Sequence, residues 1–241
     1  MRIACWSGPR NISTALMRSW SSRKDTFVSD EPFYAYYLKK TELNHPMAEK
    51  IIDYYPNTYD KVVSSINIEI PQSKKIWYQK HMAHHLINLD KIDWIKNFKN
   101  CFLIRHPKYV INSYLRKNKL YNVKELGYPQ QYDLAKYLRK SNKNFIVIDS
   151  SDLLENPERL LREWCQYLKI GYEKNMLRWE KGAYLTDGIW WKHWYNNIIN
   201  TDRFENFEKK NTGLTKEYEL IYDEALYFYE ELYKMTEYKH D

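Results

Sequence analysis

Residues 5–20 read CWSGPRNISTALMRSW. The apolar start is typical of a β-strand, a Gly-Pro pair interrupts it, and a helical pattern follows. A helix N-terminus presents unpaired N–H groups and a partial positive charge, so anions bind there. Arg10 adds a fixed charge, and Ser13 and Thr14 add hydroxyl groups. This stretch therefore predicts an anion site at the first strand-to-helix turn.

The turn lacks the lysine of the loop that binds magnesium nucleotides in kinases. That loop ends in Gly-Lys-Ser/Thr after a glycine-rich bend, whereas Gly8 is followed by Pro9 and Arg10. We therefore expect a phosphate-like group that is held without a bridging metal ion. The alternative is a turn that binds no ligand.

Outward from this turn, strand-like and helical stretches alternate along the chain. The strand-like stretches are 2–6, 26–29, 74–80, 100–107 and 144–149, and the helical ones are 13–23, 90–98, 108–118, 129–142 and 156–168. Such alternation predicts an α/β fold with a central parallel β-sheet flanked by helices. Ligands of these sheets bind beyond the carboxyl ends of the strands. We expect a single domain over residues 1–241, with a long loop at 182–198 and an amphipathic helix at 215–235.

Composition narrows the class of protein. Apolar residues make up 44% and charged residues 29%, as in ordinary globular proteins. The net charge of +7 suits an anionic ligand, a nucleic acid or simple solubility. Three scattered cysteines favour a reducing compartment, and neither a signal peptide nor a membrane span is expected. These features predict a cytoplasmic protein without a membrane partner.

The first turn resembles a loop of a known family. SGPRNISTAL, residues 7–16, resembles the loop that binds the 5′-phosphosulfate group in sulfotransferases that use 3′-phosphoadenosine 5′-phosphosulfate. The resemblance assigns a donor-binding role to Pro9, Arg10, Asn11, Ile12, Ser13 and Thr14. Ile12 stands where many members have glycine.

Three later segments follow the same family in the same order. FLIRHPKYVINSYLR, residues 102–116, resembles the 3′-phosphate segment, with Arg105 and Ser113 at the binding positions. An arginine at a strand end and a serine in the next helix can both point at one dianion. Residues 144–170 resemble a structural part of the family, and Lys181 and Gly182 match its late basic-glycine loop.

The resemblance is closest to small bacterial members that carry WSGPRNIST and DEPFY. It implies the P-loop-like sulfotransferase fold and transfer of a sulfuryl group to a hydroxyl or amine of a small-molecule acceptor, with no metal ion. The alternatives are a P-loop phosphotransferase and a basic protein that binds nucleotides or RNA. We expect no nucleic-acid partner, and the oligomeric state stays open.

Sulfuryl transfer requires a base for the acceptor proton and cations for the leaving phosphate. Arg10 is placed for the charge, and SDEPFY (29–34) offers Glu31 as the base. KHMAHHL (80–86) offers Lys80 and His81. In animal members of the family a histidine after a lysine is the base, but their Lys-Thr-His is one residue longer. The pattern favours Glu31, and the alternative is a histidine of the 81–85 cluster, of which His81 is the nearest in pattern.

Aromatic residues near these motifs have two interpretations. Tyr34, Tyr36, Tyr37, Trp190 and Trp191 either line the acceptor pocket or fill the core.

Overall fold

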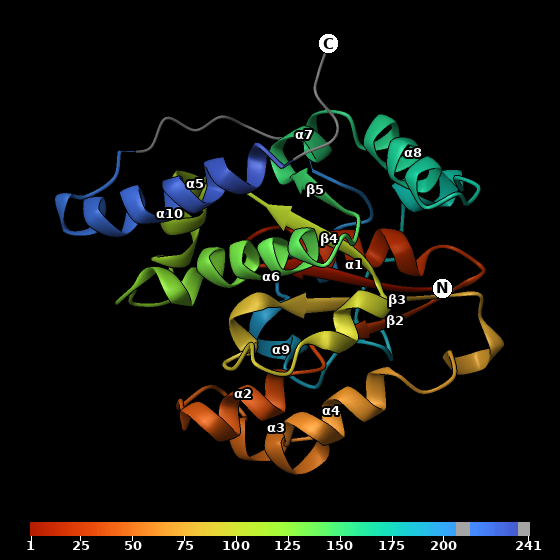
Figure 1. Cartoon of the computed structure of the whole chain (residues 1–241), viewed down its shortest axis with the longest axis horizontal. Helices are drawn as coiled ribbons and strands as arrows, with labels where there is room; N and C mark the ends of the chain where they lie inside the picture. The colour runs from red at the N-terminus through yellow and green to blue at the C-terminus, as the bar shows by residue number, and fades with distance from the viewer. Residues whose placement is uncertain (206–212, 236–241) are drawn as a thin grey trace.

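The computed structural model describes residues 1–205 and 213–235. Its five strands form one parallel sheet in the order β2-β3-β1-β4-β5 (Figure 1). The strands are β1 (Arg2–Ser7), β2 (Thr26–Asp30), β3 (Ile76–Met82), β4 (Lys99–Ile104) and β5 (Phe145–Asp149). The α/β fold with a central parallel sheet is thus confirmed.

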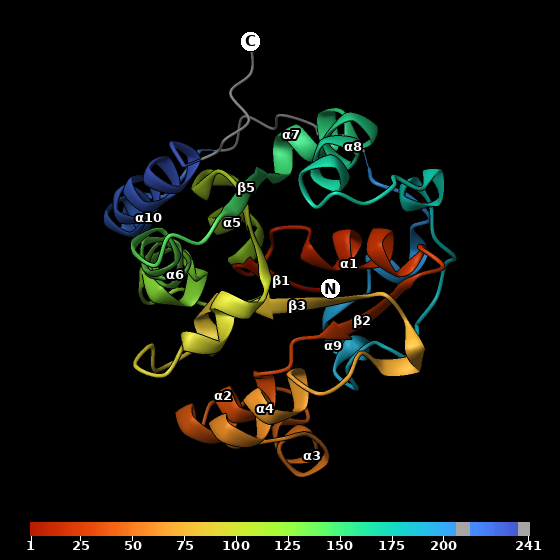
Figure 2. The same ribbon diagram turned by 45° about the vertical axis from the view of Figure 1, so that its right-hand side comes forward.

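Helices cover both faces of this sheet (Figure 2). One face packs against α1, α7 and α8, and the other packs against α4, α6 and α10. The helices are α1 (Ser13–Ser21), α2 (Tyr34–Thr41), α3 (Ala48–Tyr54), α4 (Tyr59–Ile66), α5 (Pro107–Tyr114), α6 (Tyr128–Lys140), α7 (Ser150–Glu155), α8 (Pro157–Tyr167), α9 (Trp191–Trp194) and α10 (Glu219–Tyr233).

The central strand β1 shows why the sheet lies in the core. Ile3 and Cys5 point into the core beneath α1, while Ala4 and Trp6 point into the opposite core. All four side chains are buried, as expected for a parallel strand covered on both faces. Because β1 pairs with both β3 and β4, its carboxyl end lies in the middle of the sheet edge.

Several expected elements differ in the structure. The helix expected at 90–98 is wrong: only a 3₁₀ turn forms at Asp93–Asn97, because the backbone bonds there join residues three apart, from the Ile95 N–H to Ile92 and from the Phe98 N–H to Ile95. The fourth strand stops at Ile104, before Pro107 opens α5. Helices α2, α3, α4 and α7 were not foreseen, and α9 forms inside the expected loop at 182–198.

The expected final helix is confirmed as α10. Ala225 and Leu232 are buried, and Ile221 and Tyr229 pack beside them half-buried.

Gly8 lies against the turn that precedes α6. A Cβ atom at this position would stand 2.0 Å from the carbonyl oxygen of Leu126. The neighbouring Gly127 has a φ of +77° and faces the Cα of Gly8. Glycine at position 8 therefore lets the first turn pack directly against the backbone of Leu126 and Gly127, just before α6.

This close approach predicts the effect of one added methyl group. Gly8→Ala should lower the free energy of unfolding by about 1–3 kcal/mol, because the backbone must shift to accept the Cβ. Gly171→Ala is the matched control, since no described atom lies within 4 Å of its added Cβ. Urea unfolding measures both variants, and an equal loss in the two would contradict this packing.

Candidate functional site

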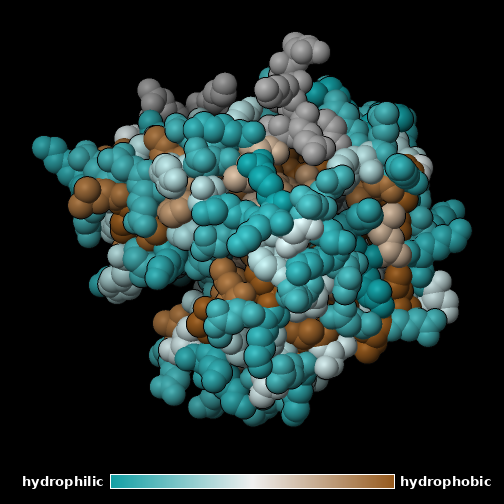
Figure 3. Space-filling model, in the orientation of Figure 1, coloured by the Kyte–Doolittle hydropathy of each residue, from teal (hydrophilic) through white to brown (hydrophobic). Residues whose placement is uncertain are grey.

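The carboxyl ends of the strands place the predicted motifs along one edge. β1 ends at Ser7, β2 at Asp30, β3 at Met82 and β4 at Ile104. Figure 3 shows the molecular surface indented between the helices α2–α4 and the helices α5, α6 and α10. The predicted anion site and both candidate bases belong to this edge of the sheet.

The first turn has the backbone shape of a phosphate cradle without the usual glycines. Arg10 has a φ of 63° and Ile12 a φ of 55°, both in the left-handed region. Ile12 is also the N-cap residue of α1, and no side chain caps this helix end. The first N–H groups of α1 therefore have no intrahelical partner and can bind an anion. Half-buried Thr14 lies in the same first turn of the helix.

The two predicted anion segments meet in space. Arg10 Nε donates a hydrogen bond of 2.9 Å to Ser113 Oγ on α5. Arg105 Nη1 donates a bond of 2.9 Å to the carbonyl oxygen of Arg10. Arg105 Nε is buried and has no hydrogen-bond partner among the described residues, so it is available to a ligand. The structure thus brings Arg10, Arg105 and Ser113 together.

A further arginine belongs to this cluster. Burial lowers the pKa of Arg10, and the nearby charge of Arg116 lowers it further. Burial is also the main cause of the lowered pKa of Arg105. Arg116 follows α5 and is exposed. The spacing from Ser113 to Arg116, almost one helical turn, is the signal by which the sequence could have indicated it.

Asn11 has a structural part in the turn. Its amide nitrogen donates to the carbonyl oxygen of Leu103 at 3.3 Å, which ties the turn to β4. Pro9 is half-buried beside it, and Ser13 is buried at the start of α1.

A buried lysine lies beside the cluster, at the end of β3. Lys80 Nζ donates to Asp30 Oδ1 at 2.9 Å and to Glu31 Oε1 at 2.5 Å. It also donates to the hydroxyl oxygen of Tyr195 at 2.8 Å. Burial alone would lower the pKa of Lys80, but the two carboxylates raise it well above its usual range. Lys80 is therefore a fixed ammonium group.

Glu31 is the open end of this network. Its side chain is 12% exposed, whereas those of Lys80 and Asp30 are 2% and 1% exposed. Burial raises the pKa of Glu31, the charge of Lys80 opposes this, and Asp30 adds to it. The backbone of Glu31 has a φ of 43°, and its N–H donates to the carbonyl oxygen of Lys80 at 2.9 Å. A partly desolvated carboxylate at a sheet edge is suited to accept a proton.

His81 points away from this network. The expectation that it lies beyond the third strand is wrong, because β3 continues to Met82 by pairing with Trp6 and Ser7 of β1. Its ring stacks on Trp6, with centroids 4.4 Å apart, in the opposite core. The side chain is buried, and burial lowers its pKa to about 3. Met82 follows at the strand end, with 8% of its surface exposed.

The aromatic residues after β2 and β3 pack on one another. His85 stacks on Tyr34 at 4.9 Å and on Tyr37 at 4.6 Å. Tyr34 also meets Trp190 edge to face. Tyr34 and Trp190 are buried and Tyr37 is half-buried, so most of the expected pocket residues fill the core in this structure.

The late basic-glycine loop lies against α1. Arg18 of α1 donates to the carbonyl oxygen of Gly182 at 3.3 Å and forms a buried ion pair with Asp187 at 2.6 Å. Its guanidinium also lies 3.7 Å from the ring centroid of Tyr184. Lys181 is exposed. No contact of the described residues joins Lys181 or Gly182 to the arginine cluster, and Arg18 was not foreseen.

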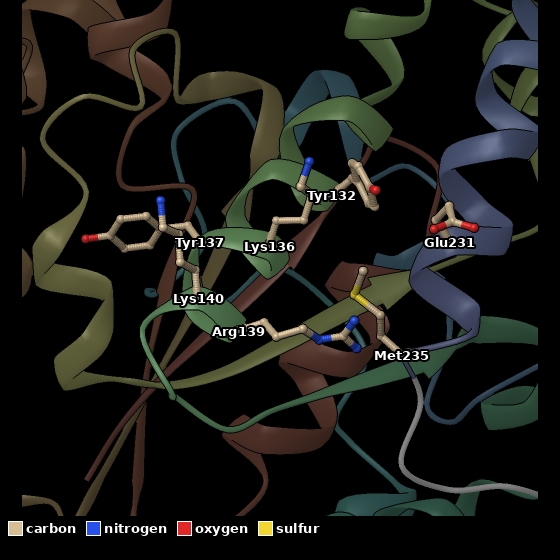
Figure 4. A pocket seen from close by; sticks show the side chains of 7 residues that line it. All are labelled: Tyr132, Lys136, Tyr137, Arg139, Lys140, Glu231 and Met235. Carbon is tan, nitrogen blue, oxygen red and sulfur yellow. The ribbon is translucent and has the colours of Figure 1, made fainter.

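A surface pocket between α6 and α10 lies apart from these motifs (Figure 4). It is lined by Tyr132, Lys136, Tyr137, Arg139, Lys140, Glu231 and Met235.

Within the ranges that the structure describes, no group of three or more His, Cys, Asp or Glu side chains could hold a metal ion. None of the described helices is both long and apolar enough to cross a bilayer.

Comparison with known proteins identifies the class. A family model described as a sulfotransferase domain matches residues 1–235. This match spans nearly the whole chain, so the chain belongs to the sulfotransferase domain family. The resemblance seen in the motifs is thereby confirmed.

Two solved structures share the fold. The sulfotransferase domain from the curacin biosynthetic pathway is 16% identical, with 92% of this chain and 96% of that one covered and a TM-score of 0.55. The sulfotransferase domain from the Synechococcus PCC 7002 olefin synthase is also 16% identical, with 100% and 96% covered and a TM-score of 0.60. These matches confirm the P-loop-like sulfotransferase fold.

Two longer plant proteins are similar in sequence. Branched-chain-amino-acid aminotransferase-like proteins 2 and 1 of Arabidopsis thaliana are each 32% identical to this chain, over 208 and 207 residues. The match covers 86% of this chain and 37% of each plant protein. The chain therefore spans little more than a third of the length of these curated relatives.

The buried His81 predicts a loss of stability in mild acid. Its pKa is about 3 in the folded chain, against about 6.5 when unfolded. Below pH 6.5 the unfolded imidazole binds a proton that the folded one refuses, so the free energy of unfolding falls by up to about 1.4 kcal/mol per pH unit. His81→Gln should remove this contribution, as urea unfolding between pH 6 and pH 4 measures.

His81→Asn provides the control for this titration, because it also removes the buried imidazole. It should show the same reduced slope of stability against pH as His81→Gln. A wild-type slope in His81→Gln would show that the histidine is not held neutral by burial.

Proposed function

We propose that this domain transfers a sulfuryl group from 3′-phosphoadenosine 5′-phosphosulfate to a hydroxyl or amine of a small-molecule acceptor, leaving adenosine 3′,5′-bisphosphate. The observation that carries the proposal is the contact of Arg10 with Ser113, beside Arg105. It joins the two segments that resemble the 5′-phosphosulfate and 3′-phosphate sites. Glu31, a carboxylate, lies farther along the same edge of the sheet.

The residues fit a donor with two anionic ends. The uncapped N-terminus of α1 and the hydroxyl of Thr14 suit the phosphosulfate end. Arg105 has a buried Nε atom without a partner among the described residues, and with Ser113 it suits a 3′-phosphate. The donor supplies an activated sulfuryl group. Arg10, which contacts both Ser113 and Arg105, would stabilise the negative charge that develops on the leaving phosphate.

Glu31 is the base that we propose. The acceptor must lose a proton, and a half-buried carboxylate whose pKa is raised by burial is a better base than an ordinary one. His81 is buried in the opposite core against Trp6 and reaches neither Glu31 nor the first turn. This placement argues against His81 as the base.

The two alternatives make different demands. A P-loop phosphotransferase needs magnesium and a lysine in the loop, and Arg10 follows Gly8-Pro9 here. A nucleic-acid-binding protein would bind polynucleotides with a steep dependence on salt. We propose that nucleic acid is not the partner, that the chain forms one domain, and that it acts in the cytoplasm, where its three free cysteines would stay reduced.

Binding of the bisphosphate tests the donor. Adenosine 3′,5′-bisphosphate at about 100 times its Kd should stabilise the fold by about 2.7 kcal/mol, even with a chelator present. Arg105→Ala should remove most of this shift, because a charge-assisted contact to a dianion is lost. Thermal unfolding with and without the bisphosphate measures both.

Arg139→Ala is the matched control, because Arg139 is exposed in the pocket between α6 and α10. It should keep the full shift. A shift that requires magnesium would favour the phosphotransferase, and the absence of any shift would refute the proposed donor.

A pair of variants tests the base. Glu31→Gln keeps the shape and removes the base, so single-turnover sulfuryl transfer should fall by about two orders of magnitude or more. His81→Asn should retain transfer once its folded fraction is taken into account. The acceptor comes from a metabolite library screened with sulfate-labelled donor, and bisphosphate binding is measured separately. Near-normal transfer by Glu31→Gln, with loss in His81→Asn, would assign the base to His81.

A further inference from the structure

Lys80 has no N–H group left for a ligand. An ammonium group has three donors, and here they go to Asp30 Oδ1, Glu31 Oε1 and the hydroxyl of Tyr195. The Lys80 side chain is 2% exposed. A lysine that served the sulfuryl group directly would first have to break one of these bonds.

Asp30 is the second fixed member of the network. The hydroxyl of Tyr195 lies 2.7 Å and 2.6 Å from its two carboxylate oxygens, and the N–H of Gly188 donates to Oδ2 at 3.1 Å. The Asp30 side chain is 1% exposed. Its partners come from β3 and from the tryptophan-rich segment around α9, which lies beside β2 and β3 (Figures 1 and 2).

The network is polar and buried at one end and opens at Glu31. Tyr195 and Asp30 are buried, whereas Glu31 faces the sheet edge with 12% of its side chain exposed. Glu31 Oε1 accepts from Lys80, which leaves the second oxygen of the same carboxylate as the one that can take a proton. The network therefore fixes one carboxylate oxygen of Glu31 through Lys80 and leaves the other oxygen free to accept a proton.

We propose that Tyr195, Asp30 and Lys80 are positioning residues that hold the carboxylate of Glu31 in place and tune its proton affinity, so that Lys80 acts through Glu31 and not on the sulfuryl group. This inference rests on the proposed function, because it takes Glu31 as the base. The tryptophan-rich segment then contributes to the reaction, because the hydroxyl of Tyr195, which follows α9, contacts Lys80 and Asp30. It also makes Lys80 a positioning residue, whereas the sequence led us to expect a catalytic residue.

The charges around Glu31 determine the direction of the effect. The groups that face it are Lys80 on β3, Asp30 on β2, Tyr34 on α2 and Tyr195 after α9. Lys80 lowers the pKa of Glu31 and Asp30 raises it. Removal of the ammonium group therefore raises the proton affinity of Glu31. Removal of the Tyr195 hydroxyl takes one acceptor from Lys80 and one donor from Asp30, whose charges act on Glu31 in opposite directions, so the affinity changes by a smaller amount.

The experiment measures the pKa of Glu31 directly in the full chain. A carbon-detected NMR titration measures the pKa of the Glu31 carboxyl in the wild type, in Lys80→Met and in Tyr195→Phe. The Glu31→Gln variant assigns the signal, because it lacks this carboxyl group. We expect the pKa of Glu31 to rise by about one unit or more in Lys80→Met and to change by a smaller amount in Tyr195→Phe. Tyr59→Phe is the matched control: it also loses two hydrogen bonds, to Lys91 and Trp94, and should leave the pKa unchanged.

If Lys80→Met does not fold, Tyr195→Phe still tests the inference. This substitution is milder, because it removes one oxygen atom and keeps the ring. In single-turnover assays the acid limb of the pH profile should move upward in Lys80→Met and should follow the measured pKa of Glu31 in both variants, with bisphosphate affinity unchanged. Loss of transfer at every pH with the Glu31 titration unmoved would show that Lys80 acts on the sulfuryl group, and would overturn the inference.

The failure of this inference differs from the failure of the proposed function. If the wild-type chain transfers no sulfuryl group, the proposed function is wrong, yet the NMR titration still reports whether Lys80 and Tyr195 control Glu31. If transfer occurs and the titration is unaffected by either substitution, only the positioning role is wrong.

Discussion

The pairing of β1 with β3 on one side and β4 on the other is the constraint on which the rest of the structure depends. Because β1 is buried on both faces, neither neighbour can slip by one residue without moving its side chains to the opposite face of the sheet. The register fixes three strand ends at one edge. The first turn, the Lys80 network and Arg105 are therefore near one another although they are distant in the sequence.

The arginines lie on one side of the edge. Arg10, Arg105 and Arg116 gather on the side of β1 and β4, where Arg10 contacts the hydroxyl of Ser113 and the charge of Asp149 acts to raise the pKa of Arg105. The carboxylates of Asp30 and Glu31 lie on the side of β3 and β2, around one ammonium group. An anionic donor is attracted to the first side, and a group that must lose a proton is suited to the second.

The sequence predicted the place of the polar residues correctly where they directly follow a strand-like pattern or precede a helical one. The first turn and the proximity of Arg105 to Ser113 follow from local patterns, and the structure brings these two residues together with Arg10. The third and fourth strands end elsewhere than expected, at Met82 and Ile104. The direction of His81 could not be read from its motif, because β3 extends two residues beyond Lys80 and successive side chains of a strand point to opposite faces. The contacts of Tyr195 and Arg18 join segments more than a hundred residues apart, and local patterns carry no information on them. The roles of the site residues stay predictions.

The left-handed backbone of the first turn has a consequence for recognising such sites. Positive φ costs a side-chain-bearing residue about 1–2 kcal/mol, yet Arg10 and Ile12 both adopt it. Ile12 packs on the core beneath α1, and the backbone of Arg10 is held by Arg105, so tertiary contacts offset the steric cost. The shape of a phosphate cradle is thus encoded by packing, and motif searches that require glycine at these positions would overlook chains built in this way.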